Sequence, residues 1–124
     1  MSDQKRRAGG TQRLRVLVLG RDHGICALCS FDAPAEERRL VEMQERGDQV
    51  ALQLRIGELR SANFNPVFNR RLRSLWDLDH IVAVVDGGND ELSNLRTLCT
   101  PCHKGATAEL LRGRMAGRGE ALAL

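Results

Sequence analysis

Four cysteines constrain this chain more than any other feature of its sequence. They form two Cys-x-x-Cys pairs, Cys26 with Cys29 and Cys99 with Cys102, and residues 30–98 separate the pairs. Each pair can present two thiolates from one tight turn, and two such pairs complete the tetrahedral ligand set of a structural Zn²⁺ site. The spacing therefore predicts that one zinc ion holds together the two ends of the long segment between the pairs.

Other uses of these cysteines stay open at this point. They could form disulfides, serve redox chemistry or lie unpaired in the core. A thioredoxin-like redox motif needs one such pair beside a βαβ unit, so a duplicated pair argues against it. His23 or His103 could also replace one of the four sulfurs. Reduced intracellular cysteines favour metal binding over disulfides.

Length and composition predict a small protein whose core needs support. The 124 residues correspond to one domain, and only 3% of them are aromatic. A metal is one way in which a small core gains stability, because metal binding then contributes folding free energy. No apolar run approaches the ~20 residues that span a bilayer, and residues 16–19 are too short for a secretory signal. We therefore expect an intracellular protein without a membrane partner.

Basic residues are concentrated in three parts of a chain whose net charge is only +3. Such clusters permit a face that binds phosphates, although each can equally be a solvated helix surface. The clusters are Lys5, Arg6, Arg7, Arg13, Arg15 and Arg21, then Arg70, Arg71 and Arg73, then Lys104, Arg112, Arg114 and Arg118.

Hydrophobic spacing and capping residues predict helices at both ends and a hairpin between them. The expected elements are helices over residues 11–22, 32–47 and 48–60, strands over 75–85 and 95–99, and a helix from 100 to about 114. Asp32 is expected to start the second helix, Gly47 to end it and Asp48 to cap the third. The third helix is ambiguous, because Val50, Leu52, Leu54 and Ile56 also alternate like a strand. In the first helix, Leu14, Leu17 and Val18 are expected to share a buried face.

A dense set of polar and glycine residues surrounds the predicted hairpin. It comprises Trp76-Asp77-Leu78-Asp79-His80-Ile81, Gly87-Gly88, Asn94-Leu95 and Leu98-Cys99-Thr100-Pro101-Cys102-His103. In this order and spacing, the set resembles the His-Asn-His (HNH) endonuclease family, which has a ββα-metal fold. The upstream segment Arg21-Asp22-His23-Gly24-Ile25-Cys26-Ala27-Leu28-Cys29 resembles the same region of zinc-containing members.

The resemblance implies an α+β fold. It would be a small ββα-metal (His-Me finger) core with a structural four-cysteine zinc site and flanking helices. The implied nuclease domain covers residues 11–115, and residues 33–74 form a helical insertion within it. Residues 1–10 would then be a disordered N-terminal tail and residues 116–124 a loose C-terminal tail.

The resemblance also implies a metal-dependent DNA endonuclease and assigns its residues. His80 matches the first histidine and would be the general base, a role that suits a side chain that titrates near neutral pH. Asp79 and His103 would hold the catalytic Mg²⁺ or Mn²⁺, for which a carboxylate oxygen is a suitable ligand. Asn94 matches the central asparagine, which mostly braces the loop between the strands.

Simpler structural roles remain open for several of these residues. Asp79 and His80 could be a salt-bridged or capping pair, and Asn94 an ordinary turn residue. Trp76 is expected in the core. The chain also departs from the family pattern, because Ala106 stands where members often carry a lysine. Lys104 or Arg112 would then supply the positive charge, and this departure weakens the expectation of the usual phosphate contact.

One catalytic site per chain predicts that the protein nicks DNA as a monomer, leaving 5′-phosphate and 3′-hydroxyl ends by resemblance. Double-strand cleavage would need a homodimer, a larger DNA-processing complex or two sequential events. The alternative functions are a non-catalytic zinc-stapled module that binds nucleic acid, and an adaptor of a larger DNA-processing machine.

Overall fold

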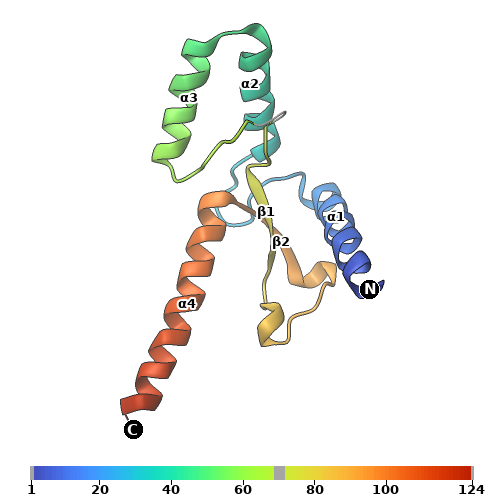
Figure 1. The fold of residues 1–124 in the computed structure, drawn as a ribbon, viewed down its shortest axis with the longest axis vertical. Coiled ribbons are helices and arrows are strands. Elements are labelled where there is room, and N and C mark those ends of the chain that lie inside the picture. The colour runs from blue at the N-terminus through green and yellow to red at the C-terminus, as the bar shows by residue number, and fades with distance from the viewer. Residues whose placement is uncertain (1, 69–71, 124) are drawn as a thin grey trace.

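The computed structural model describes residues 2–68 and 72–123. Its elements follow in the order α1 (Ser2–Asp22), α2 (Ala33–Arg46), α3 (Gln49–Ser61), β1 (Trp76–His80), the 3₁₀ turns η1 (Val84–Asp86) and η2 (Leu92–Asn94), β2 (Leu95–Cys99) and α4 (Thr100–Ala123). Figure 1 shows the two strands at the centre, with α1 and α4 on either side and the α2–α3 hairpin above them. The predicted α+β class is confirmed.

A strand–strand–helix unit forms the centre of the molecule. β1 and β2 are antiparallel, so that Trp76 lies opposite Cys99 and His80 lies opposite Leu95. α4 begins at the residue after β2 and contacts both strands, while α1 packs on β2 (Figure 1). This is the expected ββα arrangement with flanking helices.

Capping residues delimit the α2–α3 hairpin as the sequence predicts. The Asp32 side chain accepts a hydrogen bond from the Ala35 amide, and Gly47 ends α2 in the left-handed conformation with φ of 72°. The Asp48 side chain caps α3 in the same way. These caps satisfy helix-end N–H groups that have no partner inside the helix.

The ambiguous segment after Asp48 is helical because its buried side chains follow the helical period. Leu52, Ile56 and Leu59 are buried, whereas Val50 and Leu54 are exposed. A strand would have placed Val50 and Leu54 on the same face as Leu52 and Ile56. Packing of one helical face against α2 therefore decides between the two periods.

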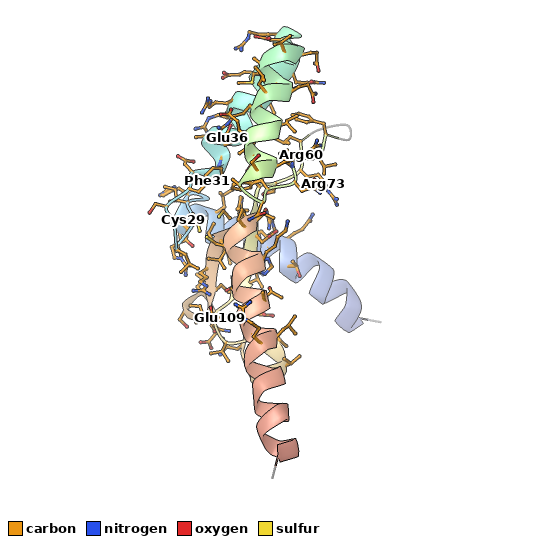
Figure 2. The ribbon with its side chains drawn as sticks, turned by 90° about the vertical axis from the view of Figure 1, so that its left-hand side faces the viewer. Cys29, Phe31, Glu36, Arg60, Arg73 and Glu109 are labelled. Carbon is orange, nitrogen blue, oxygen red and sulfur yellow. The ribbon has the colours of Figure 1, made fainter. Side chains whose placement is uncertain are left out.

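A buried ion pair and a ring contact hold the hairpin in place. Glu36 of α2 is buried, and its two carboxylate oxygens accept hydrogen bonds from Nε and Nη2 of Arg55 in α3. At the base of the hairpin, the rings of Phe31 and Phe64 pack with centroids 4.7 Å apart. Figure 2 shows Glu36 in the hairpin and Phe31 below it, beside the turn that carries Cys29.

The core confirms the burial expected for Trp76 but corrects the expected face of α1. Trp76 is buried, and the Arg15 guanidinium carbon lies 3.9 Å from its ring centroid. Val18 is fully buried, whereas Leu17 is 45% exposed, so the assignment of Leu17 to the buried face is wrong. Successive helix residues are about 100° apart around the axis, so α1 can bury Val18 while the neighbouring Leu17 stays exposed.

The first strand is shorter than the sequence predicts. β1 ends at His80, and Ile81, Val82, Val84 and Val85 are exposed in the connection to β2. The side chain of Asn94 hydrogen-bonds both the N–H and the C=O of Val82. These are the groups that a continuing strand would have paired with β2, so the strand stops before them.

The two terminal helices extend further than expected. α1 begins at Ser2 and α4 reaches Ala123, so helical backbone covers the segments expected to be a disordered tail and a loose tail. Alanine, arginine, leucine and glutamate in these segments favour helix, which offsets their glycines. The division of the chain into domain, insertion and tails stays a prediction. Within the described residues, no helix combines the length and apolar character needed to cross a membrane.

A charged pair joins the end of α1 to β2. Asp22 accepts hydrogen bonds from Arg21 and from the hydroxyl of the buried Thr97, at 3.0 Å for the latter. Arg21 also donates to the carbonyl oxygens of Leu92 at 2.7 Å and Leu95 at 2.6 Å. The hydrogen bond from Arg21 lowers the pKa of Asp22. The Arg-Asp sequence before the first cysteine pair thus has a structural role.

Replacing Asp22 by asparagine is expected to lower the free energy of unfolding by ~1–2 kcal/mol at neutral pH, because charged hydrogen bonds are lost. The lowered pKa of Asp22 means that its stabilisation is present above the unfolded-state pKa of about 3.9 and is lost as the pH falls through the folded-state value. Denaturant unfolding of wild type and Asp22→Asn across this range measures the gap. Asp32→Asn is the control, since asparagine caps a helix as well as aspartate does. A gap that stays constant as the pH falls would contradict this role.

Candidate functional site

The four cysteines meet in one cluster. Their Sγ atoms all lie within 4.8 Å of one another, and those of Cys29 and Cys99 are 3.6 Å apart. A tetrahedral zinc ion with Zn–S bonds of 2.3 Å spaces its sulfurs by about 3.8 Å. All four are free thiols in the structure. The predicted gathering of the cysteines is confirmed, and the cluster can bind a metal.

Backbone hydrogen bonds place the first cysteine pair against β2. The Cys26 N–H donates to the Phe31 carbonyl, and the Ser30 N–H donates to the Cys26 carbonyl, both at 2.9 Å. Ser30 adopts a left-handed conformation with φ of 66°, which closes the turn. The Ala27 N–H then donates to the Thr97 carbonyl of β2 at 2.9 Å. The second pair needs no such link, because it spans the junction between β2 and α4.

The pKa values of the cysteine thiols differ because their surroundings differ. Burial raises the pKa of Cys99 and raises that of Cys102 to about 11. Burial acts in the same direction on Cys26, but hydrogen bonds from the backbone of Cys99, Cys29 and Leu28 outweigh it and lower the pKa to about 6. Burial thus disfavours an unpaired thiolate at Cys99 and Cys102, and a divalent cation that binds the cluster must displace the protons of these thiols.

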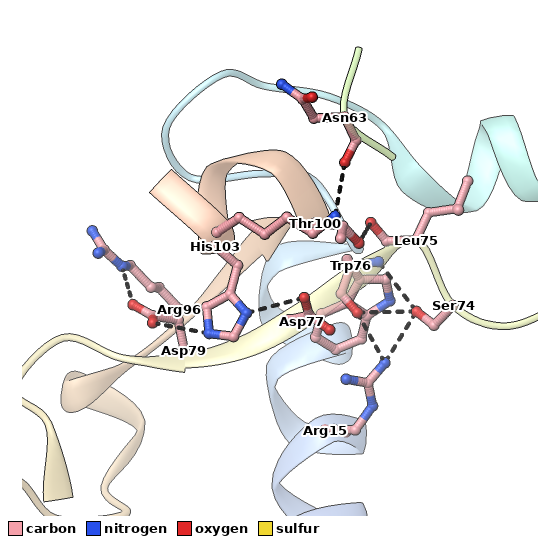
Figure 3. Close-up of polar contacts among 11 residues, drawn as sticks. Arg15, Asn63, Ser74, Leu75, Trp76, Asp77, Asp79, Arg96, Thr100 and His103 are labelled. Carbon is pink, nitrogen blue, oxygen red and sulfur yellow. Dashed lines mark hydrogen bonds and ion pairs between the residues drawn. The ribbon is translucent and has the colours of Figure 1, made fainter. Parts of the chain in front are cut away.

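A second group of polar side chains lies beside β1. Asp77 and Asp79 are two residues apart on the strand and so project from the same face. His103, in the first turn of α4, reaches both: its Nδ1 is 3.1 Å from Asp77 Oδ2 and its Nε2 is 3.6 Å from Asp79 Oδ1. The Arg96 Nε donates to the other oxygen of Asp79 at 2.7 Å. Figure 3 shows His103 between the two carboxylates.

The space between Asp79 and His103 fits a small divalent ion. Two ligands at right angles on a Mg²⁺ ion lie roughly 3 Å apart, so the 3.6 Å between Oδ1 and Nε2 admits an ion with little movement. An ionised carboxylate only accepts hydrogen bonds, so the contact with Asp77 places a hydrogen on Nδ1 of His103, and in the neutral ring the Nε2 lone pair then faces Asp79. Carboxylates commonly orient metal-binding histidines in this way.

His80 shares a cavity with these groups. It is the last residue of β1, and its Nε2 lies 2.7 Å from Asp90 Oδ1. A cavity of about 450 Å³ is lined by His80, Asp79, His103 and Arg96, among others. Neighbouring residues of a strand point to opposite faces, but β1 ends here, so Asp79 and His80 can line the same cavity. The structure thus brings together three of the residues singled out from the sequence.

Asn94 contacts the loop that joins the strands. Its Oδ1 accepts from the Val82 N–H at 2.8 Å, and its Nδ2 donates to the carbonyls of Val82 at 3.1 Å and Asn89 at 2.8 Å. Gly88 permits the same compact shape, because a Cβ at this position would lie 1.8 Å from the Val82 carbonyl oxygen. Asn94 is not among the residues that line the cavity.

Cys102 and His103 serve different groups although they are neighbours. Successive helix residues are about 100° apart around the axis. Cys102 accordingly joins the sulfur cluster, while His103 contacts the carboxylates of Asp77 and Asp79. Neither His103 nor the exposed His23 belongs to the cysteine cluster.

Sequence reasoning missed three polar residues of this region. The Asp-x-Asp alternation could have placed Asp77 beside Asp79. Arg96 could have been found from the hairpin register, because it lies directly opposite Asp79. Asp90 had no such signal, since it reaches His80 only through the conformation of the loop.

The basic clusters divide between structural and undetermined roles. Arg15 packs on Trp76 and Arg21 bonds to carbonyls of the chain, so these two have structural partners. Arg70 and Arg71 lie outside the described residues, as do the side chains of Lys5, Arg6, Arg7, Arg114 and Arg118.

The positive charge in the cavity comes from an unexpected residue. Ala106 lines the cavity, and Lys104 donates instead to the Asn63 carbonyl at 3.2 Å. Among the described residues, Arg96 is the one lysine or arginine that lines the cavity. The expectation that Lys104 or Arg112 supplies this charge is therefore not supported.

The fold and the site together define a small ββα protein with a four-cysteine cluster that can bind a metal and a cavity lined by aspartate and histidine. Comparison with known families agrees: the family model described as HNH endonuclease matches residues 67–109. The match identifies residues 67–109 as an HNH domain and supports a nuclease or DNA-processing role.

Curated relatives carry a similar segment. The human protein named "DNA annealing helicase and endonuclease ZRANB3" is 33% identical over 121 residues, which cover 89% of this chain and 10% of the relative. The Mus musculus protein of the same name is 32% identical over 117 residues, covering 89% and 11%. The chain thus spans about a tenth of the length of these relatives. No solved structure matches it significantly.

Loss of one cysteine is expected to remove metal and stability together. In Cys99→Ser the metal content should fall and the melting temperature should drop by about 10 °C, because metal binding is part of the folding free energy. Elemental analysis and thermal unfolding measure both. His103→Ala is the control and should keep the metal of the cluster. A Cys99→Ser protein with unchanged metal content and melting temperature would rule out a structural role for the cluster.

Proposed function

We propose that this protein is a metal-dependent DNA endonuclease that hydrolyses phosphodiester bonds with one catalytic divalent ion. The observation that carries the proposal is the placement of Asp79, His80 and His103 around one cavity. The match to the HNH endonuclease family model and the word "endonuclease" in the names of the relatives support it.

The two groups of ligands would hold different metals. Four thiolates in a closed tetrahedral set suit a structural zinc ion with no open position. One carboxylate oxygen and one imidazole nitrogen beside an open cavity suit Mg²⁺ or Mn²⁺, which keep free positions for water and phosphate. The zinc would then stabilise the fold, and the second ion would serve the reaction.

The residues of the cavity and of the neighbouring loop take distinct roles. His80 is the general base that accepts a proton from the attacking water. Asp79 and His103 would hold the divalent ion, which would stabilise the charge that builds on the phosphate and on the leaving oxygen. Arg96 keeps the Asp79 carboxylate oriented through its hydrogen bond. Asn94 holds the loop that follows β1 through hydrogen bonds to the Val82 backbone, and it takes no part in the hydrolysis itself.

The substrate in this proposal is the phosphodiester backbone of DNA, and the protein cuts one strand at a time. One cavity per chain addresses one scissile phosphate, so a monomer nicks, and a double-strand break needs a second copy or a second event. We further propose 5′-phosphate and 3′-hydroxyl products and an intracellular site of action, where reducing conditions keep the thiols available for metal.

A supercoiled-plasmid assay tests the proposal directly. Wild-type protein should relax the plasmid in Mg²⁺ or Mn²⁺ and not in EDTA. His80→Ala should lower the rate by ~100-fold or more, within the usual range for a general base, without changing the melting temperature. His23→Ala replaces an exposed histidine outside the cavity and should cut like wild type.

Two results would overturn the nuclease assignment. If wild type binds DNA in a salt-sensitive manner but never cuts, the protein is a zinc-stapled binding module. If it shows little affinity for DNA, it acts as an adaptor within a larger machine. Equal cutting by wild type and His80→Ala would remove His80 from the mechanism.

The separate roles of the two metal groups give a further prediction. Asp79→Ala should abolish Mg²⁺- and Mn²⁺-dependent cutting, because it removes a ligand of the catalytic ion. Its zinc content should equal that of wild type, because no sulfur of the cluster changes. Cleavage assays combined with elemental analysis decide this, and loss of zinc from Asp79→Ala would show that the two metal groups are not independent.

A further inference from the structure

The acidic partner of His80 has no role in the proposed function so far. Asp90 lies in the loop between β1 and β2, and its Oδ1 is 2.7 Å from Nε2 of His80. The side chain of Asp90 is 68% exposed, whereas that of His80 is 25% exposed. A carboxylate with such access to water has no structural need of a partner, so the contact calls for an explanation.

The chemistry of the contact determines which ring nitrogen is free. An ionised carboxylate has no hydrogen to donate, so the hydrogen between Nε2 and Oδ1 must belong to the imidazole. A neutral imidazole carries one hydrogen, and its other nitrogen then has a lone pair. Nδ1 of His80 is therefore the atom that can accept a proton.

The loop that carries Asp90 is built to hold its position. Asn94 donates to the carbonyl of Asn89, the residue before Asp90, at 2.8 Å. The Asn89 side chain accepts from the N–H of Glu91, the residue after it, at 3.1 Å. Gly88 lets the loop approach the Val82 backbone more closely than any side chain would allow. Asp90 is thus flanked on both sides by fixed backbone.

We propose that Asp90 is a positioning residue that orients His80 and holds its hydrogen on Nε2, so that Nδ1 acts as the base. The inference rests on the proposed nuclease function. The Nδ1 lone pair takes a proton from water as the water oxygen bonds to phosphorus, and the 3′ oxygen departs with the electrons of the broken P–O bond. Asp90 keeps its own charge throughout and faces the imidazolium that forms.

The kinetic test compares Asp90→Ala with a neighbouring control. Asp90→Ala should lower kcat for plasmid nicking by ~10-fold or more and leave KM within about twofold, because orientation of the base matters in the reaction step. Glu91→Ala removes one negative charge from the same loop and should leave both constants unchanged. Asp90→Glu should keep a larger kcat than Asp90→Ala, because it retains a carboxylate.

Three kinetic outcomes would overturn the proposal. These are a wild-type kcat in Asp90→Ala, a loss confined to KM, and an equal loss in Glu91→Ala. A loss confined to KM would mean that Asp90 affects DNA binding, and an equal loss in Glu91→Ala would mean that loop charge alone matters. Equal kcat values for Asp90→Glu and Asp90→Ala would also count against a carboxylate role.

A second readout does not depend on cutting. In ¹⁵N NMR spectra of the neutral ring, His80 of the wild type should carry its hydrogen on Nε2, and Asp90→Ala should show exchange between the two nitrogens. Identical ring spectra for both proteins would overturn the proposal. If the wild type never cuts DNA, the proposed nuclease function fails while the ring spectra still decide whether Asp90 orients His80.

Discussion

The four-cysteine cluster is the contact on which the rest of this structure depends. It joins the turn after α1 to the junction of β2 and α4, although residues 30–98 separate these two parts in the sequence. A chain with 3% aromatic residues has few large side chains with which to make such a long-range connection. A metal held by the four sulfurs would supply it at one point, and the helical hairpin of α2 and α3 could then form between the two cysteine pairs without displacing them.

The same cluster determines where the candidate active site forms. Cys99 ends β2 and Cys102 lies in the first turn of α4, so holding both also sets where that helix begins. His103 follows directly and is turned by about 100° toward Asp77 and Asp79. One helix start thus contributes a ligand to each of two groups. The cysteine cluster and the candidate active site are thus adjacent along the chain but use different side chains.

Much of the fold could be predicted because local chemistry and final structure agree. Asp32, Gly47 and Asp48 act at helix ends within a few residues of themselves, and the structure confirms each. The prediction was wrong where a distant side chain intervened. The apolar run after His80 has strand composition, yet Asn94 takes the hydrogen bonds of Val82 and ends β1 early. Leu17 was misassigned because only the packing of α1 on β2 decides which of two neighbouring helix residues is buried.

By itself the sequence determined the cysteine pairs, the hairpin and the order of Asp79, His80 and His103, because spacing along the chain and residue chemistry are enough to specify them. Only the tertiary structure decided how those residues are supported. Arg96 meets Asp79 through strand register, and Asp90 meets His80 through the shape of one loop. Arg15 and Arg21, two of the clustered bases, turn out to hold the chain together. Such partners depend on distances between segments far apart in sequence, which no local pattern encodes.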